Sequence, residues 1–181
     1  MRRGADVTTD PLPTWVIELD DVDSEESRAL LREYYVEVSD RWFQREEGRD
    51  STDDEIEAGF PQMRSDDLAP PTGVFLVARA QESDRIGGCV GLRRTRNASG
   101  GRVAELRRMY VRPPFRGSGL ATSLLLCAEE VARVWGVEAM RLDTRLDLVE
   151  GRDLYARNGW TEVPAFSDAF YAEVWLAKQL G

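Results

Sequence analysis

The stretch that decides the fold of this chain is residues 106–121, which read LRRMYVRPPFRGSGLA. A β-like segment ends at Val111, a short turn follows, and Arg-Gly-x-Gly-x-Ala then opens a long apolar helix. Glycines at a helix start let the backbone approach a ligand closely, and the free N–H groups of the first turn point outward with a partial positive charge. The stretch therefore predicts an anion site, most often a phosphate site.

The composition indicates a single domain and no membrane segment. The 181 residues are 42% hydrophobic and include five tryptophans, which is enough for one core. No apolar run approaches the roughly 20 residues of a membrane span, and the basic start of the chain is not followed by the apolar segment of a signal peptide. We therefore expect a cytoplasmic protein in which residues 1–13 form a flexible end.

Missing residue types exclude several kinds of chemistry. The chain has no histidine, which excludes a His-dependent triad, a His metal site and a His general base. It also lacks Gly-Lys-Ser/Thr, so the glycine turn is not that of an NTPase. We predict no metal site. Cys89 and Cys127 form no C-x-x-C motif. We interpret them as free thiols, with a disulfide or a reactive thiol as the alternatives.

The charge is unevenly distributed along the chain. Residues 18–67 carry 18 acidic and 6 basic side chains, whereas the whole chain has a net charge of −9. A negative chain does not suit general binding to DNA, RNA or an anionic membrane. The acidic segment is either a solvated helical surface or a surface that faces a cation.

The pattern of apolar and turn residues predicts a mixed domain. Capping residues and apolar spacing favour helices over residues 24–40, 52–58, 119–135 and 150–157. Short β-like runs favour strands over residues 15–19, 74–78, 88–92, 103–111, 139–143, 161–163 and 171–176. The second and third of these runs are expected to form an antiparallel pair. Strand pairs followed by β-α-β and α-β-β units predict an α+β domain.

With these elements in place, the chain resembles the GCN5-related N-acetyltransferase (GNAT) superfamily over roughly residues 74–180. The resemblance rests on Arg-Gly-Ser-Gly-Leu-Ala after Tyr-Val-Arg-Pro, on the strand-turn-helix order, and on LYARNGW at residues 154–160. The last motif is similar to the family's Leu-Tyr-x-x-x-Gly-Phe ending. The resemblance implies a single domain, residues 14–181, with a mostly antiparallel central sheet flanked by helices. It divides into a variable N-terminal helical part, residues 14–73, and a cofactor-binding core, residues 74–181.

The resemblance also implies transfer of an acetyl group from acetyl-CoA to a primary amine by direct attack in a ternary complex. It assigns the pyrophosphate of the coenzyme to a charged side chain and the N–H groups of the glycine turn: Arg116, Gly117, Ser118, Gly119, Leu120 and Ala121. In the family the preceding strand splays from its neighbour, and its free backbone groups pair with the pantetheine amides. This role falls on the backbone of Met109, Tyr110 and Val111.

Two side chains are candidates for proton chemistry on the basis of the resemblance. Tyr155 matches the tyrosine that acts as a general acid toward the leaving thiolate, with a packed aromatic as the alternative. Glu105 stands where relatives keep a carboxylate base, with a surface glutamate paired to Arg107 or Arg102 as the alternative. Strand alternation predicts that Glu105 shares a face with Arg107, Met109 and Val111.

Other parts of the pattern are less regular. Asp143, at the end of the next strand, is a weaker candidate for a base or a substrate contact. Leu148 and Gly151 stand where many relatives carry asparagine and alanine before the tyrosine, which makes the loop over residues 143–150 atypical. A cysteine nucleophile has no histidine partner and is disfavoured.

The acceptor is the least determined feature. The resemblance places its site in the variable segments, here about residues 24–63 and 167–175. Charge alone favours a small polyamine or an aminoglycoside-like cation, bound by Glu33, Glu37 and Asp40. The alternatives are a non-catalytic acyl-CoA-binding module and an acetyltransferase that acts on a protein N-terminus. A homodimer is an assembly that the resemblance leaves open.

Overall fold

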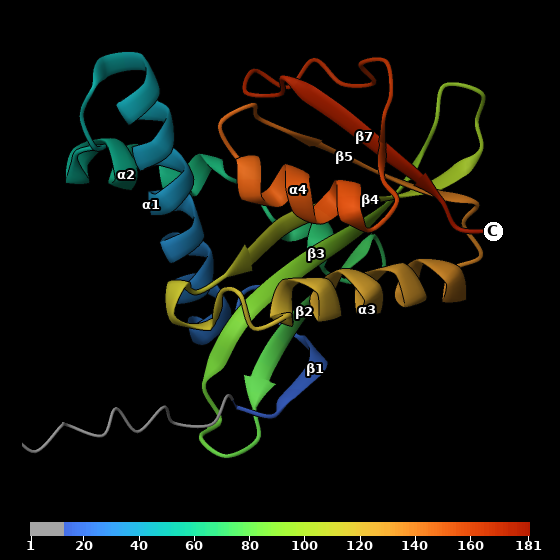
Figure 1. The fold of residues 1–181 in the computed structure, drawn as a ribbon, viewed down its shortest axis with the longest axis horizontal. Coiled ribbons are helices and arrows are strands. Elements are labelled where there is room, and N and C mark those ends of the chain that lie inside the picture. The colour runs from blue at the N-terminus through green and yellow to red at the C-terminus, as the bar shows by residue number, and fades with distance from the viewer. Residues whose placement is uncertain (1–12) are drawn as a thin grey trace, which may run out of the picture.

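The computed structural model describes residues 13–181, so the predicted flexible end, apart from Pro13, lies outside the described residues. The described chain forms one seven-stranded sheet in the order β1-β2-β3-β4-β5-β7-β6 (Figure 1). The strands are β1 (Trp15–Asp20), β2 (Gly73–Ala80), β3 (Ile86–Arg96), β4 (Arg102–Val111), β5 (Ala139–Thr144), β6 (Thr161–Glu162) and β7 (Val174–Gln179). The helices are α1 (Glu25–Glu47), α2 (Asp53–Gly59), α3 (Leu120–Val134) and α4 (Val149–Arg157).

The sheet is antiparallel except between β4 and β5, which are parallel. This confirms the predicted fold class of a single α+β domain with a mixed, mostly antiparallel sheet. The expected antiparallel pair is the hairpin of β2 and β3. The β4–β5 pairing covers only Val103–Glu105 opposite Ala139–Arg141. Beyond these residues the two strands separate, and the sheet is open in its middle.

Helices cover both faces of the sheet, so the central strands are buried on both sides. On one face α3 and α4 pack on Leu76, Val90 and Leu106 (Figure 1). On the other face Leu30 and Leu31 of α1 pack with Phe75 and Val77. A strand buried on both faces reads as a continuous apolar run, which explains the pattern Val-Phe-Leu-Val-Ala in β2. Among residues 13–181, no helix combines the length and apolar content that a membrane crossing requires.

Local capping chemistry sets the helix limits. The Ser24 hydroxyl accepts the Ser27 N–H at 3.1 Å, so α1 begins where the sequence predicts. The prediction that this helix ends near residue 40 is wrong, because α1 continues to Glu47 and stops at Gly48, whose φ of 70° suits glycine. The last strand also begins later than predicted, at Val174, because its register is set by pairing with β5.

A β-bulge interrupts β4 near its end. The register shifts opposite Cys89–Gly91, and Arg108 has a left-handed φ of 56°. The extra residue reverses the alternation of side chains beyond it. The prediction that Glu105 shares a face with Met109 and Val111 is therefore wrong, because these two pack with the α3-side core, whereas Arg107 lies with Glu105 on the α1 side.

Candidate active site

A cleft of about 1440 Å³ opens where β4 and β5 separate. It is larger than the roughly 300–1,000 Å³ of ordinary small-molecule pockets, so it has room for two ligands. Its walls come from α1, the segment before β2, the end of β4, the glycine turn, α4 and the segment before β7. Eight predicted site residues line it: Met109, Tyr110, Val111, Arg116, Gly117, Gly119, Ala121 and Tyr155. Three others do not, namely Glu105, Ser118 and Leu120.

The edges of the separated strands form the floor of this cleft. Residues 106–111 of β4 and residues 142–144 of β5 line it, and neither group has a strand partner across the opening. Backbone N–H and C=O groups at such an edge are ready to pair with an extended ligand that carries amides. The opening is therefore a place for an added strand-like molecule.

The glycine turn borders the same cleft and has the geometry of an anion site. Gly117 and Gly119 have φ values of 75° and 87°, and no atom lies within 4 Å of a Cβ placed on either residue. The helix α3 begins without a side-chain cap. No hydrogen bond among the described residues uses the backbone N–H groups of residues 117–122. These donors sit at the positive end of a 15-residue helix, where an anion is stabilised.

Other residues of the turn hold its shape. The Ser118 hydroxyl donates to the Phe115 carbonyl at 2.6 Å, and the Leu120 side chain is buried in the core with 2% exposure. Both residues therefore leave only their backbone N–H groups for a ligand at the turn. The Arg116 guanidinium donates to the Val111 carbonyl at 2.8 Å and pairs with Glu37 at 2.5 Å. Its positive charge is directed to α1 and not to the turn.

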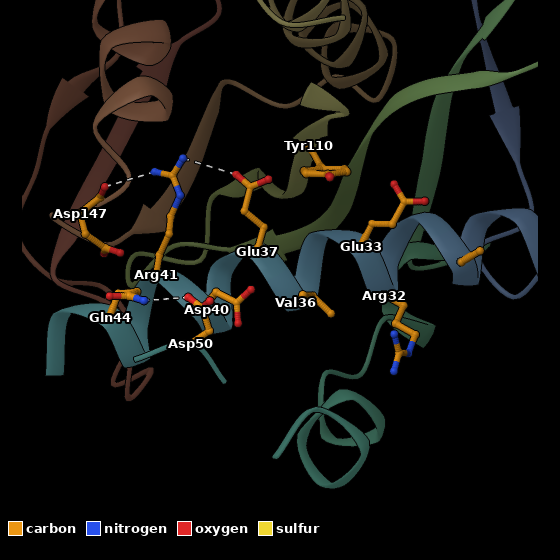
Figure 2. A pocket seen from close by; sticks show the side chains of 11 residues that line it. Arg32, Glu33, Val36, Glu37, Asp40, Arg41, Gln44, Asp50, Tyr110 and Asp147 are labelled. Carbon is orange, nitrogen blue, oxygen red and sulfur yellow. Dashed lines mark hydrogen bonds and ion pairs between the residues drawn. The ribbon is translucent and has the colours of Figure 1, made fainter. Parts of the chain in front are cut away.

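A second, shallower hollow of about 830 Å³ lies along α1 and contains the predicted cation-binding carboxylates (Figure 2). Each of these carboxylates already has a partner. Glu33 pairs with Arg112 at 2.8 Å, Glu37 pairs with Arg41 at 3.4 Å as well as with Arg116, and the Asp40 carboxylate accepts the Ser51 N–H at 2.9 Å. The structure therefore does not support the hypothesis that this acidic group binds a cationic acceptor.

Tyr155 lies on α4 with its ring against Trp160, at 5.7 Å between ring centroids. The side chain is 6% exposed, and burial raises the pKa of its phenol, which keeps the proton on the oxygen at neutral pH. The hydroxyl makes no hydrogen bond to any described residue, although the residue lines the cleft. A neutral phenol in this place is available as a donor to a ligand.

Glu105 is enclosed by arginines and does not line the cleft. It is 5% exposed, and its two oxygens accept from Arg93 Nη2 at 2.6 Å and from Arg141 Nε at 3.1 Å. The predicted surface pairing with Arg107 or Arg102 is therefore wrong, because the observed partners lie on β3 and β5. A carboxylate held by two guanidinium groups is also poorly placed to act as a base on a ligand.

The weaker candidate, Asp143, does line the cleft. One of its oxygens accepts from the Ser167 hydroxyl at 3.2 Å. The cysteines are both free thiols, which confirms that interpretation. Burial raises the pKa of both the Cys89 and the Cys127 thiol, so neither is activated as a nucleophile.

Sequence reasoning missed a group of arginines in the cleft: Arg93, Arg107 and Arg108. Arg107 and Arg108 lie inside the stretch that decides the fold, but the chain has 23 arginines, so two of them do not by themselves indicate a binding site. It also missed Asp67, which pairs with Arg93 at 2.8 Å and Arg107 at 3.1 Å. Only the folded chain brings these side chains together.

Comparisons with known proteins agree with this geometry. The family model described as "Acetyltransferase (GNAT) family" matches residues 28–160. A relative described as an uncharacterized N-acetyltransferase of Schizosaccharomyces pombe is 31% identical over 139 residues, which are 76% of each chain. The aminoalkylphosphonate N-acetyltransferase of Salmonella typhimurium is 33% identical over 60 residues, which are 33% of this chain and 39% of that one.

Solved structures show the same fold. The PaiA N-acetyltransferase of Thermoplasma acidophilum in complex with coenzyme A has a TM-score of 0.65 at 22% identity, and the match covers 91% of this chain and 99% of that one. The family match spans most of the chain. The chain therefore belongs to the GNAT acetyltransferase family and is an acyltransferase.

Proposed function

We propose that this enzyme transfers the acetyl group of acetyl-CoA to the primary amine of a small molecule within a ternary complex. The observation that supports this most is that the opening between β4 and β5 and the uncapped glycine turn border one cleft. Free N–H groups suit a pyrophosphate, and an unpaired strand edge suits the amides of a pantetheine arm. One relative is named for aminoalkylphosphonates, which are small amines. The free thiols agree with a cytoplasmic location.

In this proposal the coenzyme is held almost entirely by backbone. The N–H groups of residues 117–121 hold the pyrophosphate, and the backbone of residues 109–111 pairs with the pantetheine amides. The open space around Gly117 and Gly119 fits a close approach of phosphate oxygens. Arg116 adds its charge to the phosphates when its ion pair with Glu37 opens. The variable part, residues 14–73, supplies acceptor contacts through α1.

The chemical step asks two things of the side chains. Acetyl-CoA supplies an activated thioester. The acceptor ammonium first loses a proton. We propose that the Asp143 carboxylate receives it, because Asp143 lines the cleft. Glu105 can accept this proton only through water or after one of its ion pairs opens. The amine nitrogen then forms the new C–N bond while the C–S bond breaks. The Tyr155 phenol donates to the sulfur as negative charge develops on it.

Isothermal titration with acetyl-CoA tests the proposal with a matched pair of variants. Gly119→Glu places a carboxylate among the free N–H groups. Gly100→Glu places the same side chain at a turn remote from the cleft, with nearly the same φ, 85° against 87°, and the same open surroundings. The two variants share the backbone strain of a non-glycine residue at positive φ. They differ only in proximity to the proposed phosphate site.

We expect micromolar binding by the wild type and by Gly100→Glu, and binding weakened by roughly 10-fold or more in Gly119→Glu, because the charge-assisted hydrogen bonds are replaced by repulsion. Circular dichroism melting of all three proteins establishes that they are folded. No binding by the folded wild type, or equal weakening in both variants, would contradict the proposal. Release of thiol upon addition of amines then separates an enzyme from a non-catalytic acyl-CoA-binding module.

A further inference from the structure

The cleft contains an arginine, Arg108, that forms no ion pair with any described residue, although the Asp67 carboxylate and the Tyr34 phenol lie near enough to raise the pKa of its guanidinium. The Arg108 guanidinium donates to the Ser65 hydroxyl at 3.2 Å and to the Arg64 carbonyl at 3.0 Å, and both acceptors are neutral. Within residues 13–181, no carboxylate oxygen lies within 4 Å of its nitrogen atoms. Its neighbours differ, since Arg93 and Arg107 share the Asp67 carboxylate.

The position of Arg108 makes this missing partner costly. The residue stands at the β4 bulge with a left-handed φ of 56°, and its side chain is partly buried on the cleft wall. Burial lowers the pKa of its guanidinium, although an arginine remains charged at any physiological pH. A positive charge removed from water without a counter-ion is unfavourable unless a ligand supplies one.

The surroundings of Arg108 reinforce the excess of positive charge. The nearby ion network contains two carboxylates, Asp67 and Glu105, and three guanidinium groups, those of Arg93, Arg107 and Arg141. The Nε atom of Arg93 is buried and has no acceptor among the described residues. Together with Arg108 this group contains four arginines and two acids, and of its members Arg93, Arg107, Arg108 and Asp67 line the cleft.

Another part of the cleft lining is aromatic. Trp42 of α1 packs edge-to-face with Tyr171, with 5.8 Å between the ring centroids. Phe170, which packs on Tyr171, is 85% exposed. All of these residues line the cleft. A cleft lined by both aromatic and cationic side chains suits a ligand with an apolar body and an anionic group.

We propose that the acceptor is a small amine that carries an anionic carboxylate or phosphonate, bound by Arg108, with its apolar part against Trp42 and Tyr171. This inference rests on the proposed acetyl transfer and replaces the cationic acceptor expected from the sequence. The anionic group takes no part in the reaction. It orients the amine nitrogen toward the opening between β4 and β5.

Three acceptors with one shared body test this inference: phenylalanine, its 1-aminophosphonate analogue, and phenethylamine, which lacks the anion. Spermidine represents a cationic acceptor. Thiol release is measured at saturating acetyl-CoA, and binding of each amine to the CoA-loaded protein is measured by calorimetry. We expect the carboxylate or the phosphonate to exceed phenethylamine and spermidine in kcat/KM by roughly 10-fold or more, because each contributes a charge-assisted hydrogen bond. Whichever of the two anionic amines has the higher kcat/KM shows whether the site prefers a carboxylate or a phosphonate.

Variants of Arg108 show whether this side chain causes the preference. Arg108→Ala is expected to raise KM for the anionic amine by roughly 10- to 100-fold and to leave KM for phenethylamine unchanged. Arg108→Lys keeps the charge without the planar fork and is expected to recover part of the loss. Arg96→Ala, which removes an exposed arginine on the far end of β3, serves as the control.

The outcomes separate this inference from the proposed function. Failure of the folded wild type to bind acetyl-CoA contradicts the proposed function itself. Normal acetyl-CoA binding with a preference for phenethylamine or spermidine, or with no binding of either anionic amine, overturns only the inference. Equal losses for charged and neutral amines in Arg108→Ala and Arg108→Lys also overturn it, because they indicate a structural role.

Discussion

Removing the hydroxyl oxygen of Tyr155 separates a catalytic role of this cleft residue from its role in packing. In Tyr155→Phe the ring remains against Trp160, and the lost hydroxyl has no hydrogen-bond partner among the described residues. The free energy of unfolding is therefore expected to change by less than about 1 kcal/mol. Any large effect on turnover then comes from the missing donor.

The size of that effect follows from the environment of the phenol. General acid catalysis contributes typically about 10²- to 10⁴-fold. Burial raises the pKa of Tyr155 above that of a thiol near 8.5, so complete proton transfer to the thiolate is uphill. The phenol then stabilises the leaving sulfur chiefly as a hydrogen-bond donor. We expect kcat to fall by about 10²-fold, or about 2.7 kcal/mol in activation free energy, the low end of that range.

The pH dependence has a defined sign. An acid works in its protonated form, and a raised pKa preserves that form to higher pH. The Tyr155 phenol therefore produces no fall in kcat below about pH 10. The activity that depends on it is lost only as the pH rises through its raised pKa.

Steady-state kinetics by thiol release, with acetyl-CoA saturating, measures this prediction. Tyr35→Phe controls for the loss of a phenol hydroxyl elsewhere in the same cleft, because the Tyr35 hydroxyl lies at Gly59 of α2. A kcat for Tyr155→Phe within about threefold of the wild type, with acetyl-CoA affinity retained, would refute the acid role. Tyr155 would then be a packed aromatic residue.

Three further predictions concern the other charged and reactive groups. Lys178 pairs at 2.7 Å with Glu129, which is 1% exposed. Lys178→Met leaves this buried carboxylate without its partner and is expected to lower the free energy of unfolding, measured by urea denaturation, by about 3 kcal/mol. Adding Glu129→Gln is expected to recover much of that loss. Asp143→Asn is expected to lower kcat about 10²-fold at neutral pH. Glu105→Gln is expected chiefly to lower the free energy of unfolding, by about 1–3 kcal/mol. A large fall in kcat for Glu105→Gln and none for Asp143→Asn would return the base role to Glu105. Because burial raises the pKa of Cys89, a disulfide-exchange reagent at pH 8 is expected to modify it only after unfolding, and rapid labelling of the native protein would contradict its burial.

Local sequence was sufficient to predict the glycine turn and the strand before it, which form the proposed coenzyme half of the site. Gly117 and Gly119 before an apolar helical stripe dictate a turn with positive φ and free N–H groups, since few other residues adopt that backbone. The run from Val103 to Val111 reads as a buried strand for the same local reason. These features depend on residues close in sequence, and the structure has them where the pattern predicts.

The side chains of the proposed acceptor half are placed by tertiary structure. Glu105 belongs to β4, but its partners come from β3 and β5, and the β4 bulge reverses the face of every side chain beyond it. The acidic residues of α1 were readable as charges, yet Arg112 and Arg116, which pair with Glu33 and Glu37, lie about 80 residues away in sequence. A charge pattern records which ions the chain carries. Which of them stay unpaired, as Arg108 does, is decided only when distant segments fold together.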